Sequence, residues 1–139
     1  MRRVLLALAL WAAASSLALA YLLFSSPRAG EISIDIGIGY GNGTVVWFNG
    51  TRLQEGSTLL DATEAVAEVE YSSYPMGAFV ESINGVENSH PYYWMWWYWD
   101  GSSWREGPVA ADRYALSDGD VVFWLYEDTS VSPLRPPPG

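Results

Sequence analysis

The chain has 139 residues, enough for one domain after an apolar N-terminal stretch, and half of them are hydrophobic, which excludes a disordered composition. The formal charge is −9, and from residue 31 onward four arginines stand against sixteen acids. This acidic balance argues against binding to nucleic acid or to anionic lipid, and the absence of cysteine excludes disulfides and thiol chemistry.

The N-terminal residues 4–24 are apolar and uncharged, and they follow Arg2 and Arg3. About twenty helical residues span a bilayer, and flanking arginines stay in the cytoplasm. Two interpretations compete: a single-pass signal anchor in the cell membrane with the C-terminal domain outside, or a signal peptide of residues 1–20 whose cleavage gives a secreted protein. Because the apolar run continues to Phe24, past the small residues Ala18 and Ala20, we favour the anchor, followed by a linker at residues 25–30.

Two strands are predicted next. Residues 31–40 alternate apolar and polar side chains, with isoleucine at every second position from Ile32 to Ile38. A turn at residues 41–43 leads to a second strand at residues 44–48, and Asn49-Gly50 turns or bulges this strand before residues 52–54. Asn42 and Asn49 each begin an Asn-Gly-Thr sequence that fits the N-glycosylation pattern, although turn chemistry explains both and glycosylation stays open.

One helix is predicted in the body. Thr58 is a favourable N-cap, and Asp61 three residues later completes a capping-box pair. Apolar side chains from Leu59 to Val69 recur at helical spacing and would face a sheet, and the helix should end before Tyr71.

Strands then follow at residues 77–83, at residues 92–99 with a return through Trp104 after the Asp100-Gly101 turn, and at residues 121–127. The last strand is apolar on both faces, as a central strand tends to be. A proline-rich tail occupies residues 129–139. This order predicts an α+β, β-grasp-like mixed sheet with one helix packed on one face, preceded by a single N-terminal hydrophobic helix.

The aromatic strand is the candidate site. Alternate residues of a strand point to opposite faces, and both faces are aromatic here. A small domain buries one face in its core, so the other meets a ligand, a partner or the loop at residues 105–115. The alternation of residues along the strand does not show which of its two faces is exposed. Our candidate residues for contact with a ligand or partner are Tyr92, Trp94, Trp96, Tyr98 and Trp104.

Other candidates are weaker. His90 is the single histidine and lies in a loop, where an exposed side chain is the commoner outcome than a metal ligand. Asp118 and Asp120 flank Gly119 as in a tight turn, and their spacing matches no calcium loop. No nucleophile and base are paired by the sequence, and no two acids are singled out by their surroundings. We therefore predict no catalytic residues, no metal site and no cofactor.

Several segments together resemble one family. They are, in order, Gly-Ser-Thr-Leu-Leu-Asp-Ala at residues 56–62, the strand and turn at residues 77–86, Tyr93-Trp94, Ala-Asp-Arg-Tyr at residues 111–114, and Asp-Gly-Asp-Val-Val at residues 118–122. They are similar to the transcobalamin C-terminal-like domain (the DUF4430 group), which would cover residues 31–128. The resemblance implies a β-grasp fold and, since this domain caps the corrinoid in vitamin B12 carriers, a corrinoid as one candidate ligand. The helical domain that accompanies it in those carriers is missing from this sequence.

Together these patterns predict a non-catalytic, membrane-anchored binding module outside the cell, in which the aromatic hairpin contacts a small ring-containing molecule. The alternative is a cell-surface module whose aromatic face docks another envelope protein. Hydrolysis of glycans is the third and weakest hypothesis.

Overall fold

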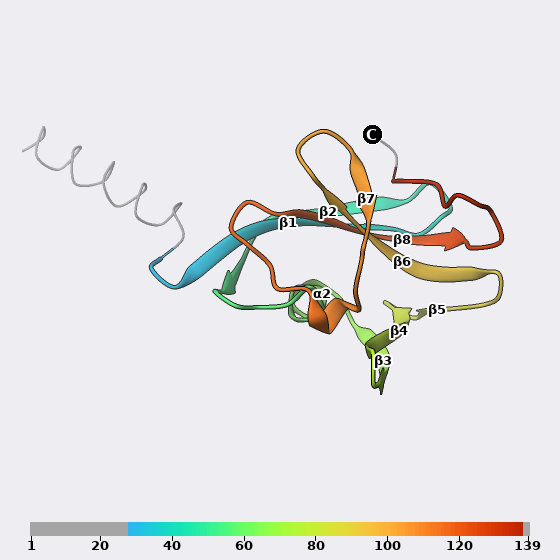
Figure 1. Ribbon diagram of the computed structural model, residues 1–139, viewed down its shortest axis with the longest axis horizontal. Helices are drawn as coiled ribbons and strands as arrows, with labels where there is room; N and C mark the ends of the chain where they lie inside the picture. Colours follow the sequence, from blue (N-terminus) through green and yellow to red (C-terminus); the bar gives the residue numbers. More distant parts are fainter. Residues whose placement is uncertain (1–27, 138–139) are drawn as a thin grey trace, which may run out of the picture.

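The computed structural model describes residues 28–137. Its elements, in chain order, are β1 (Glu31–Gly39), β2 (Val45–Gln54), α2 (Leu59–Val66), β3 (Val69–Tyr74), β4 (Gly77–Ile83), β5 (Val86–Glu87), β6 (Tyr92–Trp99), β7 (Trp104–Glu106), the 3-10 helix η1 (Ala111–Arg113) and β8 (Val121–Asp128). Strands dominate, with one α-helix among the described residues, so the α+β class and the single body helix are confirmed (Figure 1).

The larger sheet has five strands in the order β2-β1-β8-β6-β7. β8 lies at its centre, parallel to β1 and antiparallel to β6, which makes the sheet mixed and confirms the central position predicted for the last strand. The Asn49-Gly50 step bulges β2 without ending it: the register with β1 shifts between Ile34 and Ile36, and the Gly50 N–H donates to Asp35 Oδ1.

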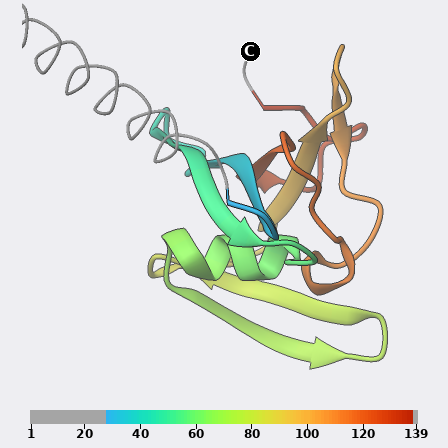
Figure 2. The same cartoon turned by 90° about the vertical axis from the view of Figure 1, so that its left-hand side faces the viewer.

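The smaller sheet, β3-β4-β5, lies across the helix from the larger one, so that α2 is held between two strand layers (Figure 2). The predicted capping box is present, because the Asp61 N–H donates to Thr58 Oγ1 and the Thr58 N–H donates to Asp61 Oδ2. The buried Trp124 indole donates to Thr63 Oγ1 at 2.8 Å, which ties the helix to the central strand.

The core forms between these layers. The four isoleucines of β1 point inward and are buried with Leu59, Ile83 and Trp124. All of the buried core residues lie between Ile32 and Trp124, so the described body has a hydrophobic core of its own. Burying this apolar surface is the main term that stabilises the fold.

Three details differ from the sequence prediction. The helix ends at Val66, and the segment that begins at Val69 is the strand β3; β-branched and aromatic residues there favour an extended chain, and pairing with β4 outweighs the helical spacing. Strict alternation along the predicted strand would place Phe79 and Ile83 on one face, yet Phe79 is exposed and Ile83 is buried, because a register shift near Tyr71 interrupts the alternation. Val86 and Glu87, where the sequence predicts no strand, form the short strand β5.

The predicted anchor at residues 4–24 lies outside the described residues. Within residues 28–137, no helix is long and apolar enough to cross a membrane.

The outer face of the larger sheet, away from α2, carries a cluster of aromatic side chains that we call the outer cluster: Trp47, Trp99, Trp104 and Phe123. The Phe123 ring lies over Gly37 and Gly39 of β1, and a Cβ added at Gly37 would come within 2.4 Å of that ring. Trp47 packs against Phe123 with ring centroids 5.3 Å apart. Glycine in β1 therefore makes room for an aromatic ring to lie flat on the sheet.

We predict that Gly37→Ala lowers the free energy of unfolding by about 1–3 kcal/mol, because the new methyl group overpacks the Phe123 ring. Urea denaturation measures the change. Ser33→Ala, on the same strand face but partly exposed, is the control and should change stability by less than about 0.5 kcal/mol. Equal effects of the two substitutions would show that the ring contact does not limit packing.

An apolar cleft beside the aromatic strand

The structure separates the predicted site residues by face. Trp94 and Trp96 point inward and are buried in the main core. Tyr98 is partly buried and stacks on Tyr114, with ring centroids 6.0 Å apart. Tyr92, at the start of the same face, is exposed. This row is therefore the core face of the strand.

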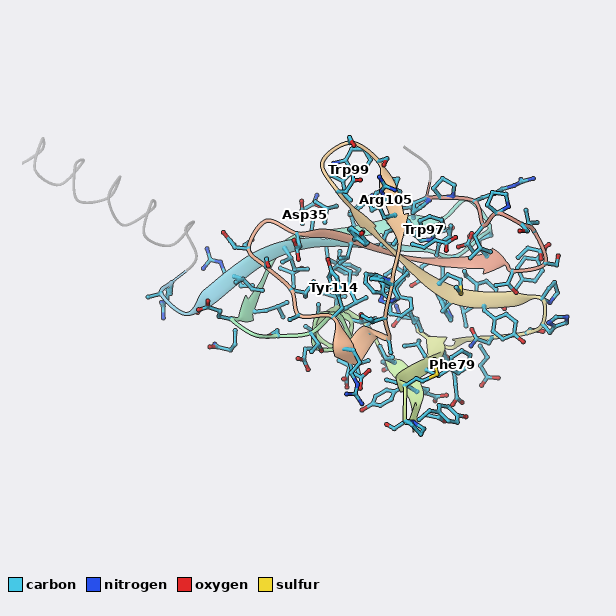
Figure 3. All side chains as sticks on the ribbon, in the orientation of Figure 1. Asp35, Phe79, Trp97, Trp99, Arg105 and Tyr114 are labelled. Carbon is cyan, nitrogen blue, oxygen red and sulfur yellow. The ribbon has the colours of Figure 1, made fainter. Side chains whose placement is uncertain are left out.

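Trp104 lies on the other face. It pairs across the hairpin with Trp99, and its ring also contacts Trp47 and Phe123. Trp99 and Trp47 are each 40% exposed, so the outer cluster is half covered. Figure 3 shows Trp97 and Trp99 on one side of the larger sheet and Tyr114 on the other. The five predicted residues thus do not form one continuous surface.

A cleft of about 650 Å³ lies where the edges of the two sheets approach each other. Its walls are mostly apolar and come mainly from the β3–β4 hairpin, the β6–β7 hairpin and the loop that leads into η1, with one residue each from β8 and the C-terminal tail. The lining residues are Tyr74, Met76, Gly77, Ala78, Phe79, Val80, Trp94, Met95, Trp96, Trp97, Glu106, Gly107, Pro108, Val109, Ala110, Ala111, Trp124 and Leu134. Two of the predicted residues, Trp94 and Trp96, are among them.

Two polar side chains hold the walls of this cleft. The Asn88 side chain donates from Nδ2 to the Val80 carbonyl and accepts at Oδ1 from the Trp94 N–H, both at 2.9 Å, so it bridges β4 and β6. Asp112 Oδ1 accepts from the Ala78 N–H at 2.8 Å and joins β4 to η1. The cleft is therefore framed by side-chain hydrogen bonds at strand edges that do not pair with each other.

The indole rings on the inner wall are held in place by their own N–H groups. Trp96 Nε1 donates to the Val109 carbonyl at 2.9 Å, and Trp94 Nε1 donates to the Val86 carbonyl at 2.7 Å. Gly107 lies directly against the Trp96 ring, where an added Cβ would come within 2.0 Å, and its N–H donates to the Trp96 carbonyl. A cleft wall with its rings held in this way is preorganised for a flat apolar ligand.

The hairpin tip is held electrostatically. Arg105 donates from Nε to Asp100 Oδ2 at 2.8 Å, and this contact, with hydrogen bonds from the N–H groups of Ser103 and Ser102, holds the pKa of Asp100 well below its usual value. The two charges at the hairpin tip therefore neutralise each other. Neither of these side chains lines the cleft.

Glu127 is the buried carboxyl of the outer face. Burial raises its pKa to about 7, while the hydrogen bond from Trp97 Nε1, at 3.0 Å, lowers the pKa and the nearby Glu106 carboxylate raises it. A carboxyl group whose pKa is higher in the folded chain than in the unfolded chain stabilises the fold below its unfolded pKa, and this contribution is lost as the pH rises through 7.

Glu127→Gln should therefore leave stability unchanged at pH 4 and increase it at pH 8 by on the order of 1–2 kcal/mol, because the amide keeps an acceptor for Trp97 without a buried charge. Urea denaturation at both pH values measures this difference. Glu70→Gln, which removes one exposed charge, controls for net charge. The same gain in both variants would assign the effect to overall repulsion rather than to Glu127.

The remaining candidates have structural roles. Asp120 Oδ2 accepts from the Ser117 N–H, as expected of a tight turn, and Asp118 Oδ1 accepts from the Ser33 N–H, which ties this turn to β1. His90 is exposed and contacts the edge of the Tyr93 ring. Among residues 28–137, no group of three or more His, Asp or Glu side chains could hold a metal ion.

The sequence did not predict most of the cleft wall that lies opposite the aromatic strand. Phe79 is 44% exposed, and Met76, Val109 and Leu134 come from a turn, a loop and the tail. An exposed methionine directly after Tyr74-Pro75 was the available signal, since turns are usually polar. Nothing in the sequence indicates that this turn faces the aromatic hairpin.

The fold is that of a small, sheet-rich domain with a cleft at one side. Comparison with known proteins identifies its family. Residues 56–128 match the family described as "Domain of unknown function (DUF4430)", so the chain belongs to this family. This confirms the transcobalamin C-terminal-like assignment. No curated protein matches the sequence.

Two solved structures share the fold. A protein from Ruminococcus gnavus, described as a candidate metal-binding protein, is 18% identical with a TM-score of 0.58, and the match covers 70% of this chain and 97% of that one. Haptocorrin in complex with Cbi is 16% identical with a TM-score of 0.57, and the match covers 73% of this chain but 26% of haptocorrin. The chain thus corresponds to about a quarter of haptocorrin, and at these identities the likeness shows the fold alone.

Proposed function

We propose that the chain is a non-catalytic binding module of β-grasp type, held outside the cell by residues 4–24, and that its ligand is a small uncharged or cationic ring-containing molecule. The observation that carries the proposal is the apolar cleft between β4 and the aromatic hairpin. Its volume lies within the usual range for small-molecule sites, about 300–1,000 Å³, and aromatic rings line it as such sites require.

The charge of the cleft narrows the ligand class. Of the described residues that line the cleft, one is a carboxylate, Glu106, and none is basic. The body around it carries four arginines against sixteen acids. An anionic ligand would be repelled, whereas a neutral or cationic ring could stack on the indoles and gain cation–π attraction.

A corrinoid is one candidate, supported by the family and by the likeness to a structure of haptocorrin with Cbi. A corrinoid that entered the cleft by one edge of its macrocycle would leave the rest of the ring available to a second surface, as expected of a module that caps a ligand held elsewhere.

The proposal predicts that a corrinoid or another ring compound quenches tryptophan fluorescence of the full-length chain in nonionic detergent, since four tryptophans are among the residues that line the cleft. Phe79→Ala should weaken the apparent affinity about five- to thirtyfold, a loss of about 1–2 kcal/mol, because it removes one aromatic wall while leaving the core intact. Titration with a corrinoid panel and an oligosaccharide panel measures both effects.

Tyr71→Ala is the matched control. Tyr71 lies on the same small sheet and is 42% exposed, close to the value for Phe79, but it does not line the cleft. If no compound quenches the fluorescence, or if both variants bind as the wild type does, the cleft is not the ligand site.

A second candidate function, docking to another envelope protein, is favoured by the outer cluster. Exposed Trp47 and Trp99 form an apolar surface on the face opposite the helix. Exposed aromatic patches of this kind mark interaction surfaces.

Under this second candidate, Trp99→Glu should abolish cross-linking of the chain to an envelope protein, because a charge would be buried in the interface. Tyr74→Glu, an equally drastic change at an exposed tyrosine away from the outer cluster, should retain it. Cross-linking in envelope extract, followed by mass spectrometry, distinguishes the two variants, and loss in both would speak against the outer cluster.

A further inference from the structure

The walls of the cleft differ in chemistry from one side to the other. Met76 and Phe79 of the β3–β4 hairpin and Val109 of the loop into η1 are apolar and exposed. Glu106 is exposed on the β7 wall, and it is the one charged residue among the described residues that line the cleft. A ligand that fills the cleft therefore meets apolar surface along most of its body and a single carboxylate at the β7 wall.

A second carboxyl group lies on the same face of the larger sheet as Glu106. Glu106 pairs with Trp97 across the β6–β7 hairpin, so the two side chains point to the same face. The Trp97 indole donates from Nε1 to Oε1 of the buried Glu127 at 3.0 Å. Trp97, which lines the cleft, thus links an exposed carboxylate with a buried carboxyl group.

The arginines closest in sequence to the cleft wall have acidic neighbours of their own. Arg105 donates to Asp100 at 2.8 Å, and Arg113 of η1 lies 3.8 Å from Asp112. Within the described part of the chain, no arginine lines the cleft. The carboxylate of Glu106 therefore meets no basic side chain on the walls of the cleft.

The titratable and charged groups near Glu127 come from the loop before β6, from β6, β7 and β8, and from the tail: His90, Tyr93, Glu106, Asp128 and Arg135. Glu106 adds to the rise in the pKa of Glu127 that burial causes. His90 and Arg135 instead add to the hydrogen bonds from Ser130 that lower the pKa of Asp128. A positive charge beside Glu106 would therefore offset the one charge that acts on Glu127.

We propose, building on the proposed function, that the cleft selects an organic cation, a quaternary or protonated amine carried by an aromatic ring. Its charge lies beside Glu106, and its apolar body lies against the β3–β4 hairpin. A positive charge at this place attracts the Glu106 carboxylate directly. It also attracts the ionised form of Glu127 across the protein interior, where charges are screened less than in water. The aromatic walls add cation–π attraction.

A metal ion fits this place less well than an organic cation. Hard metal ions take several oxygen ligands, whereas the cleft wall supplies one carboxylate among apolar side chains. An organic cation needs only one counter-charge, because its own ring covers the apolar wall.

The first test compares three ligands of similar shape: naphthylmethyl-trimethylammonium, naphthylmethanol and naphthoate, which are cationic, neutral and anionic. Titration calorimetry of the full-length chain in nonionic detergent at pH 8, with detergent alone as the blank, measures their affinities. We expect the cation to bind about tenfold tighter than the alcohol, and the anion to bind most weakly. Equal affinity for cation and alcohol overturns the selection of a cation but leaves the ring-binding function intact, whereas no binding of any compound refutes both.

The second test assigns the charge to one side chain. Glu106→Gln should weaken binding of the cation about three- to tenfold and leave binding of the alcohol unchanged. Glu70→Gln removes an exposed acid of β3 that does not line the cleft, and it should change neither affinity. An equal loss in both variants would assign the preference to the net charge of the chain and overturn the local site.

The third test uses pH. The pKa of Glu127 is about 7, because burial raises it, so this carboxyl group is protonated at pH 5 and ionised at pH 8. The cation should therefore bind about three- to tenfold tighter at pH 8. A quaternary probe does not titrate, so the change reports the protein. Glu127→Gln should lose this dependence and His90→Gln should keep it; a dependence that persists in Glu127→Gln would overturn the part assigned to Glu127.

Discussion

The pairing of β6 with β8 places large aromatic rings on both faces of one pair of strands, and the rest of the structure covers them. Trp96 lies opposite Trp124 on the inner face, and Trp97 lies opposite Phe123 on the outer face. Inner indoles must also find acceptors, because a buried N–H without a partner costs about 1–3 kcal/mol. The helix supplies one through Thr63, and the strand β5 at Val86 and the loop at Val109 supply the others.

The cleft follows from the way in which the inner face is covered. A second sheet packs across the helix, yet its strands do not pair with those of the larger sheet. The side chain of Asn88 joins the two sheets, and Asp112 ties β4 to η1. Where the edges approach without pairing, side chains surround a space instead of filling it. The outer face is covered differently: Phe123 and Trp47 lie over Gly37 of β1, and Trp104 meets both rings from the opposite edge of the sheet.

Much of the fold could be predicted because its signals are local. Alternating isoleucines identified β1, the Thr58–Asp61 pair identified the helix start, and Asp100-Gly101 identified the hairpin. The end of the helix was mistaken because apolar spacing through Val69 also suits a strand once β4 is available to pair with it. The site was predicted only in part: the aromatic strand was found, but the opposing wall, including Phe79, depends on contacts between distant segments that no periodicity records. Membership of the DUF4430 family rests on motifs spread along the chain and is confirmed.

The Asn88 bridge gives the cleft a chemical weak point. One carboxamide serves both walls, as a donor to Val80 through its nitrogen and as an acceptor from Trp94 through its oxygen. Deamidation of this side chain would keep the acceptor but replace the donor with a second oxygen, which would face the Val80 carbonyl and repel it. Ageing of a single amide would then loosen the frame of the cleft while every buried ring stayed in place.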